Sequence, residues 1–78
     1  MLQKRTRLVL DTIIELVADG AELIRPGDVA SLLRKKSQPL GIWEIRYEFS
    51  TLESEGLLRN DPDSGEWLLT KDPARKAG

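Results

Sequence analysis

The chain has 78 residues, of which 32% are charged, and its 12 Lys and Arg against 13 Asp and Glu leave a formal net charge of −1. It contains no cysteine and no histidine, so it has no disulfides, lacks the usual soft and imidazole ligands of zinc, and lacks the commonest acid–base group near neutral pH. This composition excludes a disulfide scaffold and a structural zinc site and argues against an enzyme, and we expect neither a metal nor a cofactor.

The first residues lead into an amphipathic pattern interrupted by Asp11 and Glu15 rather than into a signal-peptide core. No apolar run is long enough to cross a bilayer, so we expect a cytoplasmic protein without a membrane partner. A chain of this size builds one core. We expect residues 1–70 to form one α+β domain and residues 71–78 to form a flexible basic tail, which carries Lys71, Arg75 and Lys76.

The first half of the chain predicts two helices. Apolar residues recur at spacings of three and four between about residues 3 and 19, which predicts a helix that Gly20 ends. Residues 22–24 are expected to form a brief strand. Pro26 tolerates the first helical turn and begins a second helix to about Lys35, whose inward residues are expected to be Val29, Leu32 and Leu33.

The second half predicts a third helix and a hairpin. Pro39 breaks the helical pattern and places a loop before the third helix. This helix is expected to end near Glu55, with Gly56 as its cap and an inward stripe of Ile42, Ile45, Phe49 and Leu52. Residues 57–60 and 66–70 read as strands around a turn at 61–65, with Trp67 and Leu69 on the face that covers the helices.

This order of elements resembles the winged helix-turn-helix domains of small bacterial and archaeal regulators. The stretch from Leu52 to Leu58 is similar to the end of the recognition helix in that family, and Asp61-Pro62-Asp63-Ser64-Gly65 is similar to a wing tip. The resemblance implies a DNA-binding protein, a transcriptional regulator acting as a homodimer, with the third helix in the major groove. The chain departs from the family in a longer link between helices 2 and 3 and in an acidic wing with Asp61, Asp63 and Glu66.

If the third helix enters a major groove, its outward residues near the N-terminal half must reach base edges. These residues are Trp43, Glu44, Arg46, Tyr47 and Ser50. Arg46 can bind a guanine with two hydrogen bonds, and Glu44 can accept one from a cytosine amino group. The alternative is that Arg46 forms ordinary helix salt bridges, because Glu44 and Glu48 are close in sequence.

Further cations are candidates for phosphate contacts. Arg34, Lys35 and Lys36 follow the second helix, where cations are also favoured by the helix dipole whatever the function. A second set at the start of the chain, equally explained as a solvated helix end, is Lys4, Arg5 and Arg7. Arg59 on the first strand is a weaker candidate, because it can pair instead with Asp61 or Glu66 across the hairpin.

The rival hypothesis is a winged helix that binds protein, such as a small accessory subunit of a larger complex. In that case Trp43 and Tyr47 would anchor the interface, and the nearly neutral net charge would be expected.

Overall fold

The computed structural model describes residues 3–70, which form three helices and a two-stranded antiparallel sheet and confirm the α+β prediction. The elements are α1 (Lys4–Ala18), α2 (Pro26–Lys35), α3 (Ile42–Ser54), β1 (Leu58–Asn60) and β2 (Trp67–Leu69). The predicted bounds of the three helices are confirmed to within about one residue. The predicted basic tail at 71–78 lies outside the described residues.

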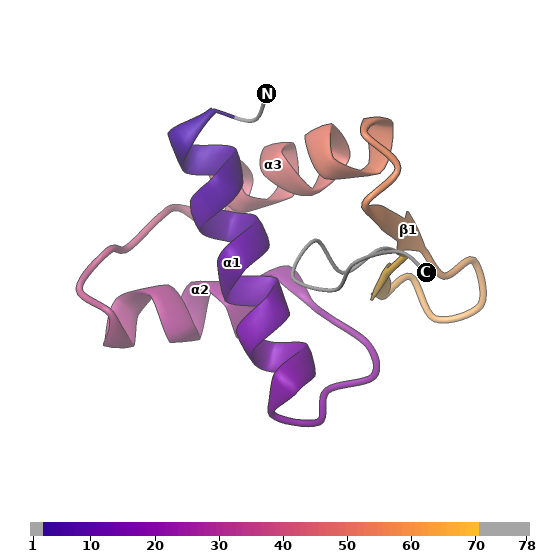
Figure 1. Ribbon diagram of the computed structural model, residues 1–78, viewed down its shortest axis with the longest axis horizontal. Helices are drawn as coiled ribbons and strands as arrows, with labels where there is room; N and C mark the ends of the chain where they lie inside the picture. The colour runs from indigo at the N-terminus through magenta and orange to yellow at the C-terminus, as the bar shows by residue number, and fades with distance from the viewer. Residues whose placement is uncertain (1–2, 71–78) are drawn as a thin grey trace, which may run out of the picture.

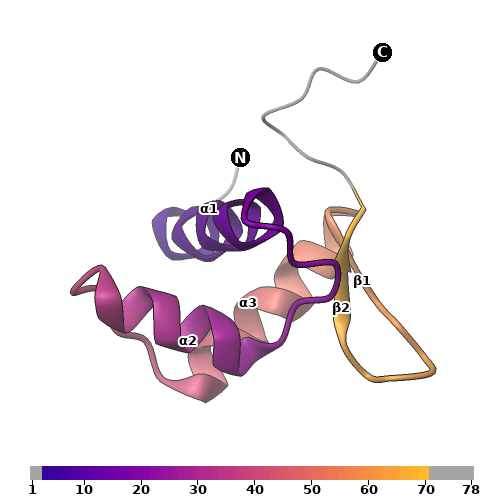
Figure 2. The same cartoon turned by 90° about the horizontal axis from the view of Figure 1, so that it is seen from below.

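The three helices enclose the core, and the hairpin closes one end of it. Helix α1 lies across α2 and α3, and the hairpin lies beside the C-terminal end of α3 (Figures 1 and 2). Each helix contacts the other two. The buried apolar side chains of this core come from the helices, the α1–α2 connection and β1, and are Val9, Leu10, Ile13, Ile24, Val29, Ala30, Leu33, Ile45, Phe49, Leu52 and Leu58. No helix within residues 3–70 has the length and apolar character needed to cross a membrane.

The short strand predicted at 22–24 is reduced to a single bridge. Ile24 and Trp67 exchange two backbone hydrogen bonds, with N···O distances of 2.7 and 2.9 Å. Figure 2 shows the α1–α2 connection passing beside β2. This bridge connects β2 of the hairpin to the segment before α2. Ile24 also packs into the core, where it is fully buried.

Trp67 of the hairpin packs against the helices, as predicted. Leu58 pairs with Leu69 and Asn60 with Trp67, and the Trp67 ring lies edge-on to Phe49 with centroids 5.4 Å apart. Trp67 and Leu69 are half-buried and pack against the core. This T-shaped contact adds stability beyond the apolar area that it buries.

Helix α2 ends at Lys35, as predicted, but the residue that ends it is Ser37 rather than Pro39. Ser37 has a φ of 61°, and its N–H donates to the carbonyl of Arg34, while the N–H of Gln38 donates to the carbonyl of Leu33. This is the hydrogen-bonding pattern of a Schellman motif with serine in the left-handed position that usually holds glycine. Helix α2 therefore ends before Pro39 constrains the chain.

The predicted inward stripes of α2 and α3 need correction. Ile42 is 41% exposed and Leu32 is only half-buried. Ile42 is the first residue of α3 and lines a surface groove instead of the core. Conversely, Glu48 lies on the buried side of α3 with only 3% of its surface exposed.

Candidate nucleic-acid interface

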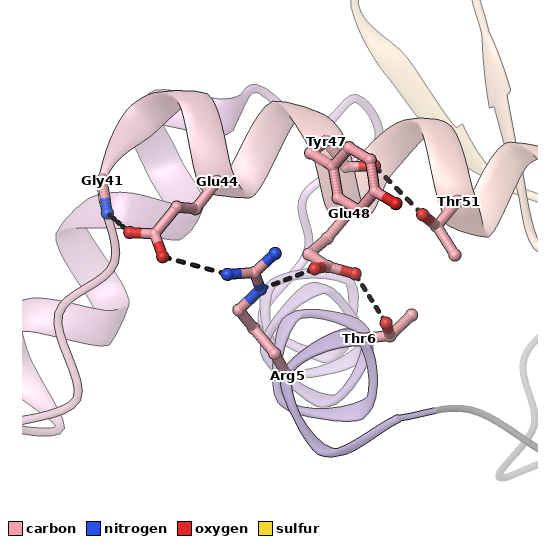
Figure 3. A network of polar contacts seen from close by, with 7 residues as sticks. All are labelled: Arg5, Thr6, Gly41, Glu44, Tyr47, Glu48 and Thr51. Atoms are coloured by element: carbon pink, nitrogen blue, oxygen red, sulfur yellow. Dashed lines mark hydrogen bonds and ion pairs between the residues drawn. The ribbon is translucent and has the colours of Figure 1, made fainter.

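The side of α3 that faces α1 carries a network of carboxylates, drawn in Figure 3. Glu48 accepts hydrogen bonds from Thr6 Oγ1 at 2.5 Å and from Arg5 Nε at 2.6 Å. Glu44 accepts one from Arg5 Nη1 at 3.0 Å and one from the Gly41 N–H at 2.9 Å, which caps the start of α3. The hydrogen bond to Glu48, aided by the charges of both carboxylates, raises the pKa of Arg5 above its usual value.

This network bears on the salt bridges considered for Arg46. Helix salt bridges from Arg46 to Glu44 or Glu48 were one alternative, but both carboxylates bind Arg5 instead. The Arg46 guanidinium lies over the ring of Trp43, 5.2 Å from its centroid, in a cation–π contact. Among residues 3–70, Arg46 has no carboxylate partner.

Arg46 and Ser50 lie on the opposite side of α3, in a groove of about 690 Å³ between this helix, the start of α2 and the hairpin. The groove is lined by Pro26, Gly27, Ile42, Arg46, Phe49, Ser50, Glu53, Asn60, Gly65 and Trp67. Residues 42, 46, 50 and 53 are three or four positions apart, so they form one stripe of the helix. Trp43 lies next to this stripe on the outer face and is 75% exposed.

Glu44 and Tyr47 are not part of this groove. Tyr47 is 64% exposed, and its ring centroid lies 6.0 Å from the guanidinium of Arg5. It lines a separate hollow of about 700 Å³ toward α1, with Thr6, Glu48 and Thr51 among the lining residues. Of the five predicted base-reading residues, Arg46 and Ser50 line the groove and Tyr47 lines the hollow toward α1. Trp43 lines neither and contacts Arg46, while Glu44 belongs to the carboxylate network.

No protein-family model, curated protein or solved structure matches this chain. Its function must therefore be inferred from its own residues and their arrangement.

The residues predicted to contact phosphates differ in whether they already form ion pairs within the protein. Arg34 and Lys35 are exposed at the end of α2, and within residues 3–70 the Arg34 side chain donates only to the Ser31 hydroxyl, at 3.3 Å. Lys36 forms an ion pair with Glu15 of α1. In the second set, Arg7 pairs with Asp11 and Arg5 belongs to the carboxylate network, while Lys4 is exposed.

The hairpin pairs its charges in a way that the sequence did not indicate. Arg59 is exposed and lies opposite Leu68 in the register, and within residues 3–70 it pairs with neither Asp61 nor Glu66. Glu66 instead forms an ion pair with Arg25, the residue before α2. This hydrogen bond and the charge of Glu66 raise the pKa of Arg25. Asp61 accepts a hydrogen bond from the Ser64 hydroxyl at 2.7 Å.

Glu48 was not predicted as part of the site, although its position in the sequence carries a signal. Glu48 follows Ile45 by three residues and precedes Leu52 by four, so it occupies the inward stripe of α3. A buried carboxylate needs charged or polar donors, which Arg5 and Thr6 supply. Within residues 3–70, no group of three acidic side chains is arranged to hold a metal ion.

Proposed function

We propose that this chain is a winged helix-turn-helix protein that binds duplex DNA through α3 and acts as a transcriptional regulator. The observation that carries the proposal is the state of Arg46, which is exposed, stacked on Trp43 and separated from the carboxylates that bind Arg5. The order of three helices followed by a hairpin beside the end of α3 supports the fold assignment.

In this proposal the N-terminal half of α3 enters the major groove, which is wide enough for a helix. The Arg46 guanidinium contacts a base edge, and Ser50, one turn later, contacts a base or a phosphate. Glu53 and the acidic turn at 61–65 disfavour close approach of phosphates to the hairpin. Arg34 and Lys35 at the end of α2 provide phosphate contacts that position the helix.

The test is a fluorescence-anisotropy titration of mixed-sequence duplex DNA at several salt concentrations. The two cationic phosphate contacts, Arg34 and Lys35, give a slope of log affinity against log salt of roughly −2. On a duplex that the protein selects from a random-sequence pool, Arg46→Ala is expected to weaken binding about tenfold or more. Arg7→Ala is the matched control, because it removes the same charge from a residue paired with Asp11 on α1, and its effect should stay within about twofold, as expected for a surface pair.

Absence of binding by the unmodified protein at low salt would refute the proposal. Equal loss of affinity in Arg46→Ala and Arg7→Ala would show that binding depends on net charge rather than on α3. Light scattering on the same sample tests the expected homodimer, which palindromic half-sites would favour.

A second function is favoured by one specific observation. Ile42, Trp43 and Tyr47 are the large exposed hydrophobic side chains of the described chain, at 41%, 75% and 64% exposure. Aromatic residues of this kind anchor protein interfaces, and the net charge of −1 suits such a role. A protein-binding winged helix would leave DNA unbound at every salt concentration in the same titration.

A further inference from the structure

Resting on the proposed DNA binding, we infer that α3 recognises a guanine next to a pyrimidine that carries a C5-methyl group. Thymine is the ordinary pyrimidine of this kind, and 5-methylcytosine carries the same group. The inference rests on the pairing of Trp43 and Arg46, which the structure places together as one exposed surface.

The spacing of the two residues matches neighbouring base pairs. Trp43 and Arg46 are three positions apart in α3, so they are separated by about 4.5 Å along the helix axis. Successive base pairs of a duplex are separated by about 3.4 Å. In recognition helices that lie in the major groove, residues three positions apart contact successive bases, so a helix that brings Arg46 to one base pair can bring Trp43 to an adjacent one.

The guanidinium selects guanine. The Arg46 guanidinium carbon lies over the Trp43 ring, 5.2 Å from its centroid, and a guanidinium carries five N–H donors that can bind two acceptors at once. Guanine presents two acceptors, N7 and O6, to this edge in the major groove, whereas adenine presents one acceptor and one donor. The absence of a carboxylate partner within residues 3–70 leaves the charge of Arg46 available to those acceptors.

The indole selects the methyl group. Trp43 has a single polar atom, the Nε1 donor, and is otherwise an apolar surface that is 75% exposed. The pyrimidine C5-methyl is the large apolar group on the floor of the major groove, and apolar side chains contact it in thymine. Cytosine lacks this methyl, and so does uracil, which otherwise has the hydrogen-bonding groups of thymine.

The experiment starts from the duplex that the protein selects from a random-sequence pool and changes single atoms in it. Replacing dT by dU removes only the methyl and is expected to weaken binding by about fourfold, the effect of burying one such group. Replacing dG by 7-deaza-dG removes the N7 acceptor and is expected to weaken binding about tenfold. Replacing the dT–dA pair by 5-methyl-dC–dG keeps the methyl group on a different pyrimidine. This duplex is compared with one that carries unmodified dC–dG, and the methylated duplex should bind more tightly.

The variants assign each effect to one residue. Trp43→Ala should abolish the preference for dT over dU, while Arg46→Ala should abolish the preference for dG over 7-deaza-dG. Tyr47→Ala is the matched aromatic control, because the Tyr47 ring contacts Arg5 rather than Arg46, and both preferences should survive it. The ratio of affinities within each variant is the readout, because a general weakening of binding leaves that ratio unchanged.

Binding with equal affinity for dT and dU duplexes, or selection of sites without this step, would overturn the inference and leave DNA binding intact. A chain that binds no duplex at all would overturn the proposed function and this inference together.

Discussion

The hydroxyl of Thr6 offers a direct test of the carboxylate network between α1 and α3. It donates to Glu48 Oε1 at 2.5 Å, and the two residues are 4% and 3% exposed. Thr6→Val keeps the volume and branching of the side chain and removes only this donor. The Glu48 carboxylate then stays buried with Arg5 as its remaining side-chain partner.

A hydrogen bond to a charged group contributes about 1.5–3 kcal/mol to stability. We therefore expect Thr6→Val to lower the free energy of unfolding by about 2 kcal/mol, which for a domain of this size corresponds to a decrease in Tm of roughly 8–16 °C. The matched control is Thr12→Val. Thr12 is also fully buried in α1, but its hydroxyl donates to the Leu8 carbonyl within the same helix, so its loss should cost less than about 1 kcal/mol.

Urea and thermal unfolding followed by circular dichroism measure both values. Equal effects of Thr6→Val and Thr12→Val would refute the reasoning, because the contact to Glu48 would then contribute no more than a local helix bond. A larger effect of Thr12→Val would indicate that packing of the hydroxyl-bearing side chains, rather than the buried carboxylate, determines the loss.

Three further predictions follow from the exposure, backbone and charges of the described residues. In Trp67→Phe the exposed Trp43 remains as the fluorophore, so acrylamide should quench it more efficiently than the half-buried indole left in Trp43→Phe; equal quenching would contradict the assigned exposures. Ser37→Gly should raise the unfolding free energy by about 1 kcal/mol, because glycine adopts the positive φ without steric cost, and thermal unfolding that shows a decrease would contradict this. Stability measured by urea unfolding should change little between pH 6 and 9. The chain has no histidine to titrate in this range. The pKa values of Arg5 and Arg25 are raised in the folded protein, so their stabilising contributions are fully present below the pKa of the unfolded chain and are lost only as pH rises through the pKa of the folded protein. A marked dependence of stability on pH between 6 and 9 would contradict this prediction.

The helices and the hairpin could be predicted from the sequence because their signals are local. Apolar spacing located all three helices, and Gly20 marked one of the ends. The left-handed residue after α2 was not predicted because serine rarely adopts this conformation, so Ser37 carries no such signal. The exposure of Ile42 was also missed, since periodicity gives the direction of a side chain but not where along a helix the core begins.

The pairing of charges could not be predicted in this way. Arg5 and Glu48 are 43 positions apart and Arg25 and Glu66 are 41 apart, so their contacts depend on how the helices cross and where the hairpin lies. Sequence spacing suggested local partners for the acidic residues of α3, whereas the fold supplies a distant arginine. This difference changes the interpretation of Arg46, the residue on which the candidate site depends.

In the proposed function, the buried residues of α3 hold the helix in place and its exposed residues contact the DNA. Glu48 is fixed by α1, and Ile45, Phe49 and Leu52 fill the core, so these residues set the rotation of the helix about its own axis. Trp43, Arg46 and Ser50 contribute no buried surface to that core. A combinatorial library at these three positions should therefore yield folded proteins with altered binding preferences, and the scaffold can acquire new targets without being rebuilt.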